Sequence, residues 1–322
     1  MTDSERVATE GRPPDAGGSS PDAPATDASA TQSVDALRRG LEAQLYFAEP
    51  DLATSIFLAL RLRRPLLLEG EAGVGKTEVA KAVARLLEGD LVRLQCYEGL
   101  DIHSSLYEWD YSRQLLQIRL LEAAGSVDPR QAEKGLYRRE MLLARPLLEV
   151  LERSRRDRPP PVLLVDELDR ADEEFEAFLL EVLSDFQVSI PELGTVRAEV
   201  PPVVVLTSNR TREVRDALRR RCLYQWIDYP DADKELRIVR AKVPEVSAGL
   251  ARRAVEVVQA LRAEDLAKAP GVAETLDWLR ALETLAIREL DAATVERTLG
   301  VLLKHRDDVE RLRGERLDRL LG

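Results

Sequence analysis

The fold of this chain is decided by the stretch Gly70-Glu71-Ala72-Gly73-Val74-Gly75-Lys76-Thr77-Glu78. The stretch follows a short apolar run, residues 65–69, and opens into good helix formers with apolar residues at helical spacing. Its glycines, at positions 70, 73 and 75, let the backbone wrap closely around a phosphate group and point N–H groups at it. The N-terminus of the following helix adds partial positive charge. The stretch therefore predicts a phosphate-binding P-loop between a strand and a helix.

Two side chains of this loop have specific chemistry. Lys76 can reach the β- and γ-phosphates of a nucleotide, and the Thr77 hydroxyl is a ligand for Mg²⁺. The alternative is a glycine-rich turn that happens to end in Lys-Thr. The complete pattern, in a strand–loop–helix context, favours nucleotide binding. Residues 70–78 are therefore expected to bind ATP together with Mg²⁺.

A second landmark is a buried strand that ends in two carboxylates. The apolar residues 162–165 fit a strand that is covered on both faces of a parallel sheet. Asp166 and Glu167 follow at the strand end, where open α/β sheets place their ligands. We expect Asp166 to hold Mg²⁺ and Glu167 to orient and polarise the attacking water. An Asp-Glu pair alone is common at loop starts, but downstream of a P-loop it indicates a hydrolytic site.

A third buried strand and a short basic helix complete the predicted site. Residues 203–207 form the strand, and Asn209 follows it at the same edge as the two carboxylates, placed to hydrogen-bond water or a γ-phosphate. Residues 216–221 form the helix, which ends in Arg220 and Arg221. These arginines are either simply solvated or presented to the γ-phosphate of a neighbouring subunit, where one of them would stabilise the transition state.

The composition bounds the remaining classes of protein. The chain has 322 residues, 44% of them hydrophobic, and no apolar stretch long enough to cross a bilayer. Two cysteines and two histidines are too few for a disulfide framework or a zinc site. The first residues lack the layout of a secretory signal, so a cytoplasmic location is expected. The net charge of −11 disfavours nucleic-acid binding, although the basic run at residues 153–158 is a counter-argument.

Composition and periodicity divide the chain into three parts. Residues 1–32 contain almost no large apolar side chain and are expected to be disordered. Residues 33–230 have the strand and helix patterns of an α/β domain, a parallel sheet with helices on both faces. Within it, residues 187–199 are expected to form a β-hairpin that projects from the sheet. Residues 231–322 show only helical periodicity and are expected to form an all-helical lid domain.

Three local predictions concern the region between the P-loop helix and the second landmark. Residues 96–111 are irregular and aromatic by pattern. Ser112 is predicted to cap a helix that contains the apolar positions of residues 115–121. Pro146 is predicted as the first residue of another helix, where its missing N–H group costs nothing.

Taken in order, these landmarks resemble the AAA+ ATPases over roughly residues 34–322, and within that superfamily the MoxR type. The resemblance to the MoxR type rests on the P-loop, the hairpin, Val165-Asp166-Glu167-Leu168-Asp169-Arg170-Ala171 and Leu206-Thr207-Ser208-Asn209. A narrower resemblance is to the ATPases associated with molybdenum-containing carbon monoxide dehydrogenase, the CoxD-like group. It rests on residues 93–101 (Arg-Leu-Gln-Cys-Tyr-Glu-Gly-Leu-Asp), 184–187 (Ser-Asp-Phe-Gln) and 270–278 (Pro-Gly-Val-Ala-Glu-Thr-Leu-Asp-Trp).

The resemblance implies a P-loop AAA+ core with a helical lid, in a ring-forming, hexameric remodelling factor driven by ATP. Such a factor would have a von Willebrand factor A-type partner protein and act as a chaperone in the maturation or active-site assembly of a metalloenzyme. By the same resemblance, Asn209 corresponds to the sensor 1 residue. Arg221 corresponds to the arginine finger, with Arg220 as the second choice.

The chain departs from the wider family at the start of the lid helix. Where relatives have a Ser-Pro-Arg-like sensor 2, this chain has Ala273-Glu274-Thr275, without the arginine. Arg280 lies five residues after Thr275 and is expected on another side of the helix. The resemblance thus supplies no sensor 2 residue, and two alternatives stay open. One is a motor that acts on nucleic acid, and the other is a scaffold that binds ATP but barely hydrolyses it.

Overall fold

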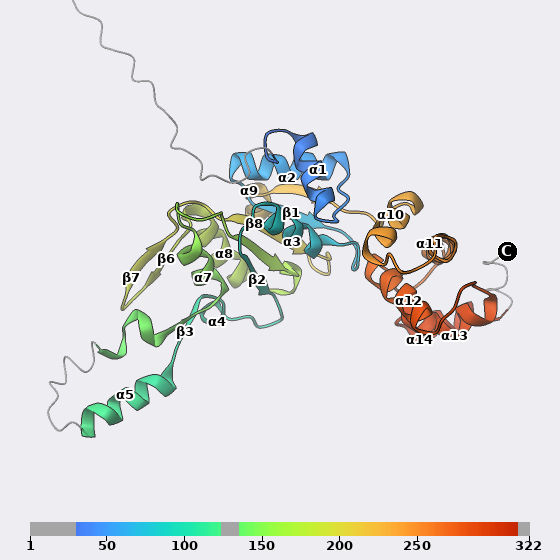
Figure 1. The fold of residues 1–322 in the computed structure, drawn as a ribbon. Coiled ribbons are helices and arrows are strands. Elements are labelled where there is room, and N and C mark those ends of the chain that lie inside the picture. The colour runs from blue at the N-terminus through green and yellow to red at the C-terminus, as the bar shows by residue number, and fades with distance from the viewer. Residues whose placement is uncertain (1–29, 124–134, 315–322) are drawn as a thin grey trace, which may run out of the picture.

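The computed structural model describes residues 30–123 and 135–314. Figure 1 shows an α/β part that contains the sheet and a helical part beside it, formed by the C-terminal residues. The predicted α/β class with a parallel sheet is confirmed. Most of the predicted disordered tail, residues 1–29, and the end of the predicted lid, residues 315–322, lie outside the described residues.

The central sheet has five strands in the order β2-β5-β8-β1-β9, and every neighbouring pair is parallel. The near-continuous apolar sequence of β1, β5 and β8 suits strands that are covered on both faces. Because the strands are parallel and in register, the residues that follow β1, β5 and β8 meet at one edge. The bounds are β1 (Leu66–Glu69), β2 (Leu91–Gln95), β5 (Val162–Asp166), β8 (Val203–Ser208) and β9 (Leu223–Trp226).

Helices cover both faces of this sheet (Figure 1). Alternate residues of β1 point to opposite faces, so Leu66 and Leu68 lie in one apolar core and Leu67 in the other. The first core is completed by α1 (Val34–Ala43), α2 (Pro50–Leu62) and α3 (Lys76–Leu86). The second is completed by α7 (Pro146–Arg153), which begins at the predicted proline, and by α8 (Glu173–Asp185). The short helix α9 (Asp216–Arg221) precedes the edge strand β9.

The segment after β2 is more regular than its sequence predicts. It contains α4 (Ile102–Leu106) and β3 (Tyr107–Trp109), which pairs with β4 (Leu142–Ala144). Strands of three residues are too short for an alternating pattern to reveal them. The prediction that Ser112 caps the next helix is wrong. Helix α5 (Tyr111–Ala123) is capped by Asp110, whose Oδ1 accepts a hydrogen bond from the Arg113 N–H at 2.9 Å.

A two-stranded hairpin lies at the place predicted for the insert. Its strands are β6 (Gln187–Ile190) and β7 (Gly194–Arg197), paired from Gln187 opposite Arg197 to Ile190 opposite Gly194. Figure 1 shows the hairpin extending away from the central sheet. Val188 and Ile190 are nevertheless buried against the core that contains α8. One face of the hairpin is therefore part of the α/β core, and only the other is available to solvent.

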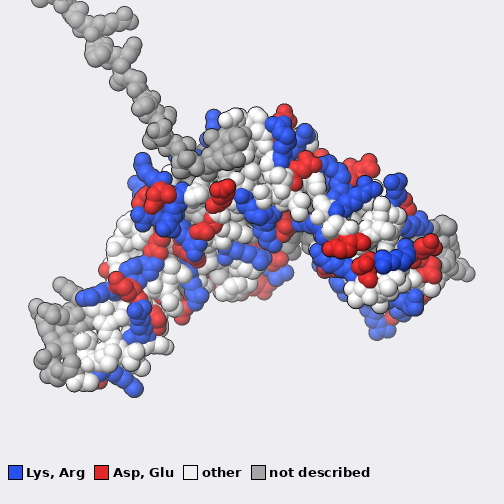
Figure 2. Space-filling model, in the orientation of Figure 1, with Lys and Arg blue, Asp and Glu red and all other residues white. Residues whose placement is uncertain are grey.

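After β9, the described residues are helical. The helices are α10 (Ala232–Lys242), α11 (Ala248–Arg262), α12 (Val272–Thr284), α13 (Ala292–Leu302) and α14 (Arg306–Leu312). They enclose a core of their own around Trp278, which is fully buried and donates a hydrogen bond from Nε1 to the Thr298 hydroxyl at 2.8 Å. On the face shown in Figure 2, acidic and basic groups are interspersed over both parts.

Among the described helices, none has the length and apolar character needed to span a membrane.

Candidate active site

A cleft of about 350 Å³ lies at the edge of the sheet where β1, β5 and β8 end. The α/β part lines it with Ala72, Gly73, Gly75, Lys76, Thr77, Glu78, Asp166, Glu167, Thr207 and Asn209. The helical part lines it with Lys242, Val272, Ala273, Leu276, Asp277 and Arg280. The structure therefore brings together side chains that the sequence analysis selected from three separate stretches, and it adds helices α10 and α12 on the opposite side.

The ammonium group of Lys76 is held inside the P-loop. Lys76 is buried, and its Nζ donates to the carbonyl oxygens of Gly70 and Glu71, each at 2.7 Å. Burial lowers the pKa of Lys76, although nearby carboxylates, that of Asp169 first, oppose the shift. A phosphate would offer this cation charged oxygens in place of two neutral carbonyls. Val74, the remaining predicted loop residue, is buried in the core under the loop.

The loop backbone reaches the helix through glycines in the left-handed region. Gly73 has a φ of 84° and Gly75 a φ of 98°, conformations that other residues adopt only at a cost. Gly75 is the N-cap of α3, so the free N–H groups of the first helical turn begin at the cleft. This geometry is the anion-binding arrangement that the sequence predicts.

Three oxygen-bearing side chains converge beside the loop. The Thr77 hydroxyl donates to Oδ1 of Asp166 at 3.0 Å, and the Thr207 hydroxyl donates to the same oxygen at 2.6 Å. Asp166 is only 3% exposed. Hydroxyl and carboxylate oxygens are the ligands that Mg²⁺ prefers. The donor set of Thr77 and Asp166 therefore fits the ion expected from the sequence.

Glu167 has an unusual backbone conformation at the entrance to the cleft. Its φ is 55°, in the left-handed region, and its N–H donates to the Thr207 hydroxyl at 2.9 Å. Its carboxylate forms an ion pair with Arg170, with 2.9 Å between Oε2 and Nε. A non-glycine residue in this region costs on the order of 1 kcal/mol, and such residues concentrate at functional sites.

Asn209 lies in a loop that is fixed by a buried carboxylate. Asp169 accepts hydrogen bonds from the N–H of Asn209 at 3.1 Å and from the N–H and hydroxyl of Thr211 at 2.9 and 2.6 Å. Burial alone would raise the pKa of Asp169, but these hydrogen bonds outweigh burial and lower it. The loop after β8 is thereby tied to the residues after β5, and Asn209 lines the cleft.

The helical part touches the P-loop directly. The Val272 N–H, at the start of α12, donates to the Gly73 carbonyl at 3.0 Å. Thr275, which the resemblance aligns with a sensor 2 arginine, is buried and donates to the Glu235 carboxylate at 2.8 Å. Arg280 lies on a different side of α12 from Thr275, as expected, and that side lines the cleft. The helical part therefore does present an arginine to the site.

Comparison with known proteins identifies the family. Residues 66–227, half of the chain, match the model of the family described as ATPase family associated with various cellular activities (AAA). The chain belongs to the AAA family of ATPases. The matched region contains the P-loop, the two carboxylates at the end of β5 and Asn209. Nucleotide binding and ATP hydrolysis therefore follow from membership of this family.

Solved structures with a similar arrangement include Thermotoga maritima RuvB. One is a point mutant with 15% sequence identity and a TM-score of 0.46, covering 84% of this chain and 73% of its own. Another is described as the RuvB Holliday junction branch migration motor, with 14% identity and a TM-score of 0.44, covering 84% of this chain and 72% of its own. A comparison with curated proteins finds no match.

The two candidate finger arginines of this AAA ATPase lie outside its own cleft. Arg220 and Arg221 end α9, and both are exposed. Among the described residues, neither guanidinium has a hydrogen-bond or ion-pair partner, whereas their neighbour Arg219 reaches Glu69, with 3.4 Å between Nη2 and Oε2. The structure thus does not bring Arg220 or Arg221 to the P-loop of the same chain.

Sequence reasoning missed several residues of the site. Arg93 in β2 forms an ion pair with Asp166, with 2.5 Å between Nη2 and Oδ2. The sequence could have suggested this position, because Arg93 is the exposed middle residue of an edge strand, and the end of that strand pairs with the end of β5. Thr207 is the penultimate residue of the buried strand β8 at the same edge, which is a comparable signal. No sequence pattern predicts that Lys242 lines the cleft, because its position depends on how α10 packs against the α/β part.

Proposed function

We propose that this AAA ATPase hydrolyses Mg-ATP to remodel a client protein during maturation or active-site assembly of a metalloenzyme, such as a molybdenum carbon monoxide dehydrogenase. The observation that carries the hydrolytic part is the contact between Thr77 and Asp166, 3.0 Å apart, beside a buried P-loop lysine. The choice of client class rests on the stretches that resemble the MoxR and CoxD-like groups. The protein would act in the cytoplasm.

Each residue of the cleft has a proposed part in the reaction. Lys76 and the N-terminus of α3 bind the phosphates and neutralise their charge. Thr77 and Asp166 hold Mg²⁺, which supplies further positive charge at the phosphate oxygens when bound. Glu167 orients the attacking water and accepts its proton. Asn209 donates from its side-chain amide to that water or to the γ-phosphate.

We infer that the active site is shared between subunits of a homo-oligomeric, hexameric ring. Arg221, with Arg220 as the second choice, would reach the ATP of the neighbouring subunit. Exposed guanidinium groups without partners in the described chain support this assignment, because they remain available to an anion. A von Willebrand factor A-type protein is the proposed partner that connects the ring to its client.

Nucleotide binding is tested with Lys76→Ala. Removing a charge that binds phosphate costs about 2 kcal/mol or more, so the affinity for ATP should fall by about 30-fold or more. Isothermal titration with the purified full chain measures it. Equal affinity in the wild type and the variant would reject the assignment of the P-loop.

The shared site is tested by mixing two inactive variants. Arg221→Ala should bind ATP but hydrolyse it about 10³-fold more slowly, as expected for loss of an arginine finger. After subunit exchange with Lys76→Ala, roughly a quarter of the interfaces in a randomly mixed ring combine an intact phosphate site with an intact finger. Part of the ATPase activity should return. If mixed rings form and no activity returns, Arg221 does not act across the interface.

The client class is tested with Glu167→Gln, which should trap the ATP-bound state. A pull-down with this variant and ATP is expected to retain a von Willebrand factor A-type protein and metalloenzyme subunits, and one with ADP to release them. Stimulation of wild-type hydrolysis by DNA, together with no such retention, would instead favour a motor that acts on nucleic acid.

A further inference from the structure

An arginine just before the strand that leads into the P-loop binds the end of α9, the helix that bears the candidate finger residue Arg221. Arg64, just before β1, donates from Nη2 to the carbonyl oxygens of Arg220 at 2.8 Å and Cys222 at 3.2 Å. Its Nε donates to the carbonyl of Arg221 at 3.1 Å. One side chain thus binds three consecutive carbonyls at the end of α9.

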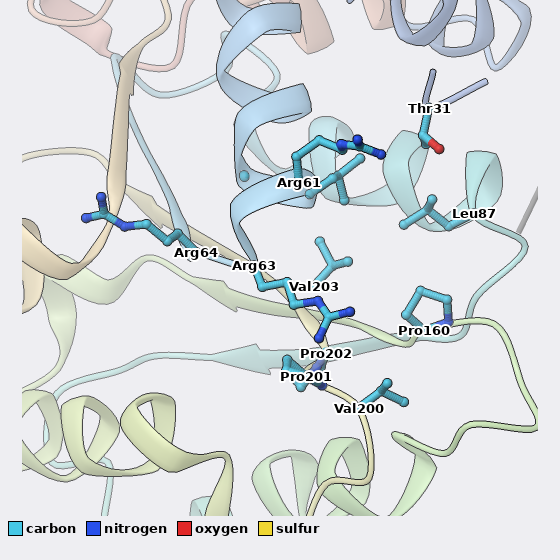
Figure 3. A pocket seen from close by; sticks show the side chains of 12 residues that line it. Thr31, Arg61, Arg63, Arg64, Leu87, Pro160, Val200, Pro201, Pro202 and Val203 are labelled. Atoms are coloured by element: carbon cyan, nitrogen blue, oxygen red, sulfur yellow. The ribbon is translucent and has the colours of Figure 1, made fainter. Parts of the chain in front are cut away.

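The direction of Arg64 differs from that of its neighbours. Arg61, Arg63 and Arg64 all line a cavity of about 230 Å³ at the edge of the sheet opposite the active site. Figure 3 shows the guanidinium of Arg64 directed away from those of Arg61 and Arg63. The contact with α9 is therefore specific to one of three nearby arginines.

The physical reason lies in the length of α9. A helix of six residues is not stable by itself, and its last carbonyls have no partners within the helix. The guanidinium supplies donors to these carbonyls and places positive charge at the negative end of the helix dipole. A planar guanidinium can bridge several acceptors at once, whereas the ammonium of lysine is a single point charge.

A second contact holds the same helix from the other end of β1. Glu69, the last residue of the strand, is 1% exposed, and its Oε2 lies 3.4 Å from Nη2 of Arg219. The guanidinium of Arg219 also lies over the ring of Tyr224, 5.5 Å from its centroid. Oε2 of Glu69 also lies 3.9 Å from Nε of Arg210. Because a buried carboxylate without cationic partners would be strongly destabilising, the shorter contact with Arg219 helps to fix α9 relative to the start of the P-loop.

We propose that Arg64 is a positioning residue for Arg221, assisted by the contact between Glu69 and Arg219. Held at both ends of β1, α9 presents Arg221 to the neighbouring subunit in one orientation. The same strand continues into the P-loop at Gly70. The position of Arg221, which would act on the neighbouring subunit's ATP, is therefore linked through β1 to the P-loop of its own subunit. This inference rests on the proposed function of Arg221 as a finger in trans.

The test compares Arg64→Ala and Arg64→Lys with the matched control Arg63→Ala in the full chain. A misplacement of about 1 Å can cost about 100-fold in rate, so we expect turnover of both Arg64 variants to fall by about tenfold to 100-fold. ATP affinity should stay within about threefold of wild type, since the P-loop is untouched. Arg63→Ala should keep wild-type turnover, because among the described residues the side-chain hydrogen bonds to the end of α9 come from Arg64 and none comes from Arg63.

Mixing separates positioning from a general loss of structure. Subunits with Arg64→Ala have an intact phosphate site and a misplaced finger, so Lys76→Ala subunits should restore their activity. A mixture of Arg64→Ala with Arg221→Ala should show no gain over the low turnover of Arg64→Ala alone, because neither variant supplies a correctly placed finger. A variant that is merely misfolded would lose ATP affinity and would not be rescued.

The outcomes distinguish the two proposals. If Arg221→Ala is not rescued by Lys76→Ala, the shared site itself fails. If that pair recovers but both Arg64 variants turn over like wild type, or lose activity without rescue by Lys76→Ala, the positioning role of Arg64 is overturned.

Discussion

Arg93 forms an ion pair with Asp166, a residue that lines the cleft, with 2.5 Å between Nη2 and Oδ2. The same carboxylate accepts hydrogen bonds from the hydroxyls of Thr77 and Thr207. Asp166 is buried, whereas the side chain of Arg93 is 50% exposed. If Thr77 and Asp166 hold Mg²⁺ as proposed, the guanidinium of Arg93 competes with the ion for this carboxylate, and its exposure leaves it room to move into solvent.

Arg93→Ala is expected to lower the Mg²⁺ concentration that gives half-maximal ATPase activity. Removing a competing cation frees Oδ2 of Asp166. Because Arg93 is half exposed, its pairing energy is discounted to about 0.5–1 kcal/mol, which corresponds to about a two- to fivefold shift. Magnesium titration at saturating ATP measures the shift. Arg38→Ala, which removes an exposed arginine of α1, is the control; an increased Mg²⁺ requirement in Arg93→Ala would contradict the competition.

Glu167→Gln is expected to lower kcat by about 10²- to 10⁴-fold, the usual contribution of a general base. The backbone position of residue 167 should survive, because the Thr207 hydroxyl binds its N–H and not its side chain. ATP affinity should therefore stay near that of wild type. Steady-state hydrolysis and equilibrium titration are measured on the same preparation, with the exposed Glu213→Gln as the control. Normal turnover would remove Glu167 from the mechanism.

The sheet and its main helices follow from local patterns in the sequence. Residues 66–69, 162–166 and 203–208 are apolar strands covered on both faces, and such runs are predictable without knowledge of their neighbours. The two strands β3 and β4 are not, since each has three residues and finds its partner far along the chain. Lys242 reaches the site only through the packing of α10 against the α/β part, so spacing along the sequence does not reveal it.

Gly271→Ala is expected to separate the helical part from the P-loop. A Cβ at position 271 would lie 2.7 Å from Cα of Gly73, although the φ of −83° suits any residue. Because both sides of this contact are backbone, the overlap should cost about 1–3 kcal/mol and weaken ATP binding by about fivefold or more. Gly249→Ala, where no atom lies within 4 Å of the new Cβ, is the control. Unchanged affinity in Gly271→Ala would show that the contact is not needed for binding.

The stability of the protein should fall in alkaline solution because of its two cysteines. Burial raises the pKa of Cys96 to about 12 and that of Cys222 to about 12, from an ordinary value of 9.0. Between pH 9 and pH 12 the unfolded chain loses the thiol protons, while the folded chain retains them. Their stabilisation is thus present below pH 9 and is lost as the pH rises toward 12. Urea unfolding at pH 8 and pH 10 should show a smaller alkaline loss in the Cys96→Ala, Cys222→Ala double variant; an equal loss would contradict the shifts.

Arg280 is one of two cations, with Lys242, that the helical part contributes to the lining of the cleft. It lies on the cleft side of α12, the helix whose first N–H binds the Gly73 carbonyl. Its ion pair with Asp277, 3.1 Å between Nη1 and Oδ1, is exposed at both partners and is therefore easily exchanged for a phosphate.

If Arg280 binds the γ-phosphate, Arg280→Ala should weaken ATP binding by about tenfold or more, the value of a charge-assisted hydrogen bond, and ADP binding much less. Titrations with ATP and ADP measure both affinities, and Arg288→Ala, whose guanidinium pairs with Glu283, is the control. Equal losses for ATP and ADP would place Arg280 on the other phosphates. No loss for either nucleotide would mean that Arg280 does not bind the nucleotide. The scaffold alternative, a protein that binds ATP but barely hydrolyses it, would then be tested only by comparing the turnover of the wild type with that of Glu167→Gln.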